Sequence, residues 1–281
     1  MKLSFSTLAC PTWSSAQAIQ AAVDYGYDGI EWRLVDGEIL NSSMPLGAAA
    51  KLGDATRAAG LTTCAADTGV RDVKLILPPG SEREGMLTEA RAMLKVAAAL
   101  GAEYLRVFPG DCPDGVPREV ANGWATANIQ ALSDDVQASG VRLALELHDA
   151  PGSAADSERP TSSQVAMQIL EGIGEEAGGI LWDWGNTFLE GEQSQVTWEK
   201  VRSRLLYCHT KDMLTYADGS STYVAAGSGA IPIQDILGWL AEQGMQDMWL
   251  SYEWEKKWHP ELAEPEVALP QYVEFMRSLD D

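Results

Sequence analysis

Eight short apolar segments alternate with eight longer segments of helical periodicity along the 281 residues of the chain. The apolar segments are rich in Val, Ile, Leu, Tyr and Trp, a composition typical of buried strands. They predict strands at residues 2–9, 29–34, 61–67, 104–108, 141–148, 180–184, 205–211 and 248–254. Strictly alternating strands and helices favour an α/β fold with a parallel sheet.

The segments between the strands predict helices at residues 14–25, 45–59, 82–100, 118–139, 161–173, 193–204, 233–243 and 271–279. Several end at a glycine, as at Gly26, Gly101 and Gly140, where the chain must turn back to the next strand. Eight such units in this length predict a single (β/α)8 TIM barrel that occupies residues 1–281 as one domain. The rival is an open doubly wound sheet, but its glycine-rich nucleotide motif does not follow the first strand.

The charge balance excludes some partners. The net charge is −21, with 41 acidic and 20 basic residues, so nucleic acid and anionic membrane surfaces are poor partners. No apolar run is long enough to span a bilayer, and the first residues look like a strand and not a signal peptide. Four scattered cysteines indicate reduced thiols packed as small apolar residues. We therefore expect a cytoplasmic protein.

Charged side chains occur where a barrel interior normally carries branched aliphatic ones, and they do so at one end of the later strands only. Glu146, Asp183, His209 and Glu253 lie at the carboxyl ends of four successive predicted strands. TIM-barrel enzymes build their active sites on this face. Earlier strands add Glu31, Arg33 and Arg106 at the same end, and we expect Arg106 to contact a substrate there. His148 and Lys211 share faces with the later residues.

A carboxylate buried alone is costly unless it is protonated, paired or bound to a metal. Three carboxylates and one imidazole that converge on one point are best explained by a cation. This mostly oxygen set suits Mn²⁺ best, with Mg²⁺, Co²⁺ or Zn²⁺ as alternatives. Any one of these residues alone would be explained more readily as an ion pair or cap at a strand end. That explanation does not account for four such residues on four successive strands.

The other polar residues and the tryptophans have alternative roles. Lys211 and His148 could each protonate a departing oxygen. The alternative role of Lys211 is a salt bridge to Asp212 or Glu255, and that of His148 is to orient a metal ligand. Of the ten tryptophans, Trp13 is the best candidate for a wall against a sugar ring. Trp32, Trp182 and Trp184 alternate away from the polar set, so we expect them beneath the helices.

At these residues the sequence resembles the sugar isomerase/epimerase superfamily, the xylose isomerase-like TIM barrels that include ketose epimerases, inosose dehydratases and hydroxypyruvate isomerases. The phrases that carry the resemblance are Leu145-Glu146-Leu147-His148, Asp183-Trp184-Gly185-Asn186, His209-Thr210-Lys211-Asp212, Gly227-Ser228-Gly229-Ala230-Ile231-Pro232 and Tyr252-Glu253-Trp254-Glu255. The resemblance implies that Glu146, Asp183, His209 and Glu253 bind the metal and that both glutamates also act as the acid/base pair. It implies substrate contacts for His148, Asn186 and Lys211, and a homodimer or homotetramer.

Two positions depart from the epimerase pattern. Asn186 stands where the epimerases commonly have a substrate-binding histidine, and Ser228 stands where an acidic residue is expected in a Gly-Glu-Gly turn. These departures leave the metal site intact but widen the expected reaction beyond epimerisation. DNA cleavage in this fold uses several histidines, whereas this chain has only His148, His209 and His259.

The predicted site indicates how a reaction would begin more clearly than how it would end. A metal that chelates a carbonyl and its neighbouring hydroxyl acidifies the α C–H, and a glutamate removes the proton to leave an enediolate. Return of the proton gives a sugar epimer or isomer, whereas loss of a β leaving group makes the enzyme a dehydratase or lyase acting on a keto-sugar, inosose or 3-keto-glycoside. A non-catalytic sugar-binding barrel is the third alternative. Because no glycine-rich anion nest is evident, a neutral sugar or polyol is the favoured substrate.

Overall fold

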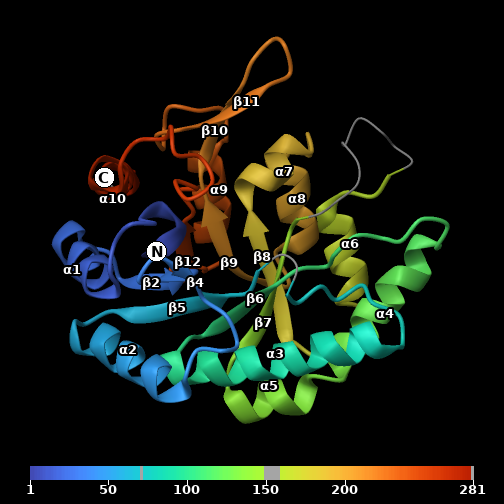
Figure 1. Cartoon of the computed structure of the whole chain (residues 1–281). Coiled ribbons are helices and arrows are strands. Elements are labelled where there is room, and N and C mark those ends of the chain that lie inside the picture. Colours follow the sequence, from blue (N-terminus) through green and yellow to red (C-terminus); the bar gives the residue numbers. More distant parts are fainter. Residues whose placement is uncertain (70–71, 149–158, 280–281) are drawn as a thin grey trace.

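The computed structural model describes residues 1–69, 72–148 and 159–279. Eight parallel strands close into a barrel in the order β1-β12-β9-β8-β7-β6-β5-β2, with helices on its outside (Figure 1). The expected TIM barrel is therefore confirmed. Its strands are β1 (Lys2–Ser6), β2 (Gly29–Trp32), β5 (Thr62–Asp67), β6 (Tyr104–Val107), β7 (Arg142–Glu146), β8 (Gly178–Asp183), β9 (Leu205–Thr210) and β12 (Trp249–Tyr252).

The helices follow the strands in the order that the alternation predicted. They are η1 (Thr7–Ala9), α1 (Ser15–Tyr25), α2 (Leu46–Ala58), α3 (Ser81–Leu100), α4 (Arg118–Gln130), α5 (Ser133–Ser139), α6 (Ser162–Ile169), α7 (Trp184–Leu189), α8 (Ser194–Val201), α9 (Ile233–Glu242) and α10 (Pro265–Ser278). Within the described ranges, no helix has both the length and the apolar character needed to cross a membrane.

Helix α1 shows how closely local signals set the element boundaries. The Ser14 hydroxyl accepts a hydrogen bond from the Gln17 backbone, and the Gln17 side chain accepts one from the Ser14 backbone in return. At the other end Gly26 adopts a φ of 81°, in the left-handed region that glycine tolerates best. The predicted start and end of this helix are confirmed.

Two predicted helices differ in the structure. The helix expected at residues 118–139 is broken between α4 and α5, where the turn buries the side chain of Leu132 completely. The last helix starts at Pro265 and not at residue 271. Pro265 occupies the first turn, where a missing N–H has no helical partner to lose, and the helix continues through Pro270 despite one absent hydrogen bond.

Two hairpins that the sequence did not predict extend the carboxyl ends of two barrel strands. The first, β3 (Leu34–Val35) with β4 (Glu38–Ile39), follows β2. The second, β10 (Asp212–Thr215) with β11 (Ser221–Val224), follows β9 and projects beyond the barrel on the side toward which β8 and β9 point (Figure 1). Both hairpins therefore lie at the mouth of the barrel.

The two faces of the strands carry different cores. The inner face holds a small buried layer of Cys64, Ala65, Tyr104, Ala144, Leu181, Tyr207 and Trp249. Most polar residues of the mouth lie two positions beyond a member of this layer, as Glu146 lies beyond Ala144 and His209 beyond Tyr207. The outer face belongs to the large cluster beneath the helices, and Trp32, Trp182 and Trp184 lie there as predicted.

All four cysteines are free thiols, in agreement with the sequence expectation. Cys10, Cys64 and Cys208 are buried in the barrel wall and core, whereas Cys112 is half-buried in the loop between β6 and α4. The buried thiols occupy positions that small apolar residues fill elsewhere.

Candidate metal centre

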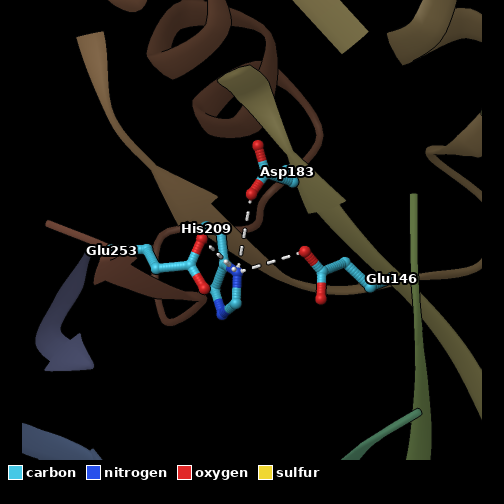
Figure 2. A group of neighbouring side chains, drawn as sticks. All are labelled: Glu146, Asp183, His209 and Glu253. Atoms are coloured by element: carbon cyan, nitrogen blue, oxygen red, sulfur yellow. Dashed lines mark ion pairs between the residues drawn. The ribbon is translucent and has the colours of Figure 1, made fainter. Parts of the chain in front are cut away.

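Four side chains converge at the carboxyl ends of neighbouring strands. Glu146 and Asp183 are the last residues of β7 and β8, His209 lies near the end of β9, and Glu253 directly follows β12. One nitrogen or oxygen of each lies within 4.8 Å of those of the others, and all four side chains are buried. Figure 2 shows Glu146 and Glu253 approaching His209 from opposite sides, with Asp183 completing the group. Such a group could hold a divalent metal ion.

The polar atoms at the centre of this group fit a cation. His209 Nδ1 lies 3.4 Å from Glu253 Oε2, 3.7 Å from Asp183 Oδ2 and 3.8 Å from Glu146 Oε1. His209 Nδ1 is buried without a hydrogen-bond partner. Asp183 Oδ2 and Glu146 Oε2 are buried too, and each has an ion pair, to Lys211 at 2.8 Å and to Arg106 at 3.4 Å. Buried polar atoms are rarely left unpaired, and a hard divalent ion would satisfy this mostly oxygen set.

A short helix orients two of these carboxylates. Asp183 is the N-cap of α7: its Oδ1 accepts the Asn186 backbone N–H at 2.8 Å, which leaves Oδ2 to face the group. The Asn186 side-chain amide donates to Glu146 Oε1 at 3.3 Å and to the Leu147 carbonyl at 3.2 Å. Asn186 therefore fixes the positions of both carboxylates.

Glu31 holds the imidazole from the opposite side of the barrel. Its Oε1 lies 2.8 Å from His209 Nε2 and accepts a hydrogen bond from the Tyr207 hydroxyl at 3.0 Å. Burial acts to raise the pKa of Glu31, but the charge and hydrogen bond of His209 lower it to about 2. Because Nε2 is occupied in this way, Nδ1 is the nitrogen left for a ligand.

Arg106 connects the two glutamates. Its Nη1 lies 3.0 Å from Glu253 Oε1 and 3.4 Å from Glu146 Oε2. Nη2 donates to the Thr68 carbonyl at 3.3 Å, and Nε lies 3.6 Å from Asp67 Oδ1. All three guanidinium nitrogens therefore face protein groups, and the guanidinium keeps the carboxylates of Glu146 and Glu253 in a fixed relation.

Lys211 is buried against three carboxylates. Its Nζ lies 2.8 Å from Asp183 Oδ2, 2.5 Å from Glu253 Oε2 and 3.1 Å from Glu255 Oε1. Burial acts to lower the pKa of Lys211, but Asp183 and Glu253 raise it well above its usual value. Of the two salt bridges that the sequence allowed for this lysine, the structure forms the one to Glu255 and not the one to Asp212.

Asp212 connects the end of β9 to the glycine-rich turn at residues 227–232. Its carboxylate accepts the backbone N–H groups of Gly227, Gly229 and Ile231 at 3.0, 2.7 and 3.2 Å. A Cβ on Gly229 would lie 2.0 Å from Asp212 Oδ1, so only glycine permits this approach. The turn therefore packs directly onto the strand end that carries His209 and Lys211.

Carboxylates outnumber lysine and arginine side chains at this end of the barrel. Six carboxylates meet three lysine and arginine side chains among the described residues: Glu31, Asp67, Glu146, Asp183, Glu253 and Glu255 against Arg33, Arg106 and Lys211. Burial raises the pKa of Glu146, whereas His209 and Lys211 hold that of Glu253 well below its usual value against the effect of burial. Two more positive charges would offset most of the difference.

Two candidates from the sequence lie outside the four-residue group. His148 follows β7, is half-buried, and has its ring centroid 5.2 Å from that of Phe108. Trp13, in the loop after η1, donates from Nε1 to Glu266 at the start of α10 at 3.3 Å. The structure therefore brings Arg106, Asn186 and Lys211 into contact with the group and leaves Trp13 engaged elsewhere.

Two buried carboxylates of the site, Glu31 and Asp67, were assigned no role in the sequence analysis. Glu31 was placed at the mouth, and Asp67 ended a predicted strand without being singled out. Strand alternation carries the signal for both, because each lies two positions beyond an inward-facing Gly29 or Ala65. Asp67 is fully buried, its two oxygens lack hydrogen-bond partners, and burial raises its pKa well above the usual value.

The family model of the xylose isomerase-like TIM barrel matches residues 19–279, so the chain belongs to this family. No curated protein matches its sequence significantly. Among solved structures, it is similar to an IolI protein with a bound zinc atom, with a TM-score of 0.78 and 19% identity over 99% of this chain and 98% of that chain.

Two further structures cover 99% of both chains. One is D-psicose 3-epimerase in the presence of D-fructose, with a TM-score of 0.77 and 13% identity. The other is the probable 3-DHS dehydratase AsbF of Bacillus anthracis, with a TM-score of 0.73 and 14% identity. At such low identities the likeness establishes the shared fold, and the named activities belong to those proteins.

Proposed function

We propose that this chain is a divalent-metal-dependent sugar isomerase or epimerase that acts through an enediolate on a ketose or keto-sugar derivative. Glu146, Asp183, His209 and Glu253 bind one ion, Mn²⁺ in first place, with Mg²⁺, Co²⁺ or Zn²⁺ as alternatives. The observation that carries the proposal is the buried group of three carboxylates around His209 Nδ1, which lacks a hydrogen-bond partner. The zinc atom bound by the similar IolI protein supports a divalent ion as the ligand.

The bound ion supplies a Lewis acid that polarises the substrate carbonyl. Proton transfer falls to the chain's own residues. Glu146 and Glu253 reach the centre from opposite sides (Figure 2), so one removes the α proton and the other returns a proton to the opposite face or to the neighbouring carbon. Arg106 bridges both carboxylates and keeps them in place as their protonation changes. Asn186 and Lys211 contact substrate oxygens beside them, and His148 and Trp13 contact more distant parts of the substrate.

Elimination is the second candidate, and Lys211 favours it. Its ammonium group contacts Asp183 and Glu253 directly, so it is placed to give a proton to an oxygen that leaves from the carbon next to the reacting one. The same α-proton abstraction would then make the enzyme a dehydratase or lyase acting on a keto-sugar, inosose or 3-keto-glycoside. The similar structure of a probable dehydratase agrees with this alternative.

The remaining expectations are proposals of the same kind. We place the protein in the cytoplasm, as the free cysteines and acidic composition suggest. A small sugar or polyol derivative is its partner, and a homodimer or homotetramer is its assembly.

Metal analysis tests the central claim. The purified protein should hold about one divalent ion per chain, and a Glu146→Gln/Asp183→Asn variant should lose it. A protein that stays metal-free under metal-replete conditions would overturn the proposal. Incubation with ketoses, inososes and 3-keto-glycosides in D₂O then separates the reactions. Deuterium α to a carbonyl supports the enediolate route, and loss of water or aglycone selects elimination.

A further inference from the structure

Arg33 is a nearly buried cation for which the described residues provide no ion-pair partner. It follows β2 directly and shares the inner face of that strand with Glu31, so its side chain enters the mouth. The residue is 6% exposed, and its Nη1 is buried without a hydrogen bond. Across the described ranges, the guanidinium forms no ion pair with a carboxylate. Arginine is almost never buried in this way unless it is paired.

The other two cations of the mouth are paired with carboxylates. Lys211 contacts three carboxylates, and Arg106 contacts Glu146, Glu253 and the Thr68 carbonyl. Among the carboxylates whose charge acts on Arg33, Asp67 acts most strongly, and it already lies 3.6 Å from Arg106 Nε. Of these three cations, Arg33 is therefore the one whose guanidinium is available to bind a ligand.

The charges that act on Arg33 include those of the mouth of the barrel. Burial and the positive charge of Arg106 lower its pKa, while Asp67, Asp72 and Glu253 act in the opposite direction. An exposed surface arginine would not sense both Arg106 and Glu253, which are buried in the barrel. The guanidinium is therefore close enough to the buried charges of the mouth to be affected by them.

Its position in the barrel separates it from that group. In the closed strand order, β2 stands opposite β8, the strand that carries Asp183. The candidate ligands occupy β7, β8, β9 and the end of β12, whereas Arg33 lies on the other half of the ring. A sugar whose reacting carbons lie between Glu146 and Glu253 would extend its far end toward Arg33.

We propose that Arg33 binds an oxyanion carried by the substrate, a carboxylate or a phosphate group at the end remote from the reacting carbons. The planar guanidinium offers parallel N–H donors that match both groups. This inference rests on the proposed function for its substrate class: it changes the expected substrate from a neutral sugar or polyol to an acidic one, a sugar acid or a sugar phosphate. Binding of the oxyanion supplies the partner that the buried guanidinium lacks.

Anion binding is measured first, without any reaction. Inorganic phosphate and acetate are titrated calorimetrically into the metal-free and Mg²⁺-loaded protein, for wild type, Arg33→Met and Arg33→Lys. The exposed Arg202, which pairs with Glu199, provides the control variant Arg202→Met. We expect Arg33→Met to weaken binding of the preferred anion at least tenfold, Arg33→Lys to fall between, and Arg202→Met to match wild type.

The preferred anion distinguishes a sugar acid from a sugar phosphate. Equal affinities of wild type and Arg33→Met in both forms of the protein would overturn the inference, as would the absence of anion binding by wild type. Since Arg33→Lys keeps the charge and most of the volume, it covers the case in which Arg33→Met fails to fold. A failure of metal binding appears separately in the metal analysis, and the metal-free titration still stands on its own.

Paired substrates extend the test to turnover. Deuterium exchange in D₂O is compared for D-fructose against D-fructose 6-phosphate, and for D-tagatose against D-tagaturonate. We expect exchange with one acidic member, and we expect Arg33→Met to raise its KM at least tenfold with a smaller change in kcat. Equal kcat/KM for the neutral and the acidic member, unchanged in Arg33→Met, would contradict the proposal.

Discussion

At the scale of single residues, His209 is the side chain whose orientation the site defines most completely. Glu31 occupies its Nε2 at 2.8 Å, and three carboxylates surround its Nδ1. A carboxylate on the far nitrogen of a metal-binding histidine fixes the tautomer and raises the basicity of the other nitrogen. Glu31 therefore acts on a bound ion through His209 and not by contact.

Replacing Glu31 tests this relation. We expect Glu31→Gln to weaken metal binding by about 10- to 100-fold, as other changes behind a ligand do, because the amide no longer stabilises the required tautomer. Tyr207→Phe, which removes only the hydrogen bond from Tyr207 to Glu31, should have a smaller effect in the same direction. Calorimetric titration with Mn²⁺ measures both. An unchanged affinity in Glu31→Gln would show that the hydrogen bond to His209 is only structural.

Lys211 and a bound ion would contact the same carboxylates, so the contribution of Lys211 to the free energy of unfolding should depend on whether the ion is bound. Without metal, Lys211→Met leaves Asp183 and Glu253 without their ammonium partner, and we expect unfolding to require about 3–5 kcal/mol less free energy. With saturating Mn²⁺ the loss should be much smaller, because the ion takes over the pairing.

Urea unfolding with chelator and with Mn²⁺ gives the two values. Lys200→Met is the matched control, because Lys200 pairs with Glu192 away from the site, and metal should not alter its effect. The same loss for Lys211→Met in both conditions would disprove the linkage.

At the scale of elements, the β10–β11 hairpin and the turn after it are fixed to the barrel through Asp212. We expect Asp212→Ala to lower the free energy of unfolding by about 2–4 kcal/mol, because it leaves several backbone N–H groups without an acceptor. Asp218→Ala, at the exposed end of the same hairpin, should change it by less than about 0.5 kcal/mol. Denaturant titration compares the two, and equal losses would show that Asp212 does not anchor the turn.

The strand positions and the four proposed ligands could be predicted from the sequence because strand alternation is local. It places Glu146, Asp183, His209 and Glu253 on inward faces without knowledge of the neighbouring strands. The same local rule separated Trp182 from Asp183, and the structure confirms that Trp182 packs beneath the helices.

Contacts across the barrel could not be predicted in this way. Glu31 on β2 meets His209 on β9, and these strands are not neighbours in the closed order. The bridge from Arg106 to both glutamates likewise depends on barrel closure and register. One strand boundary was also wrong. A predicted strand ended at Trp184, whereas Asp183 caps α7, which begins at Trp184.

At the scale of the whole molecule, metal binding and folding should be coupled. An ion that binds only the folded chain stabilises it by about 2.7 kcal/mol at a hundredfold excess over Kd, and we expect Tm to rise by about 5 °C or more. If residues 1–281 form one domain, the protein should unfold in one cooperative transition with and without the ion.

Differential scanning calorimetry with Mn²⁺ and with chelator measures this shift. The Glu146→Gln/Asp183→Asn variant should unfold at the same temperature in both conditions. Two separate transitions would contradict the single-domain prediction, and a wild-type Tm that does not respond to Mn²⁺ would contradict the metal site.

The distribution of the thiols allows selective chemical labelling of one cysteine. Cys10, Cys64 and Cys208 are almost completely buried, and burial raises the pKa of Cys208 to about 12, so its reactive thiolate is scarce. Cys112 alone among the four is partly open, in the loop that follows the carboxyl end of β6. A maleimide fluorophore would therefore attach to the unaltered chain at one place, beside the mouth, and could report ligand entry without any engineered cysteine.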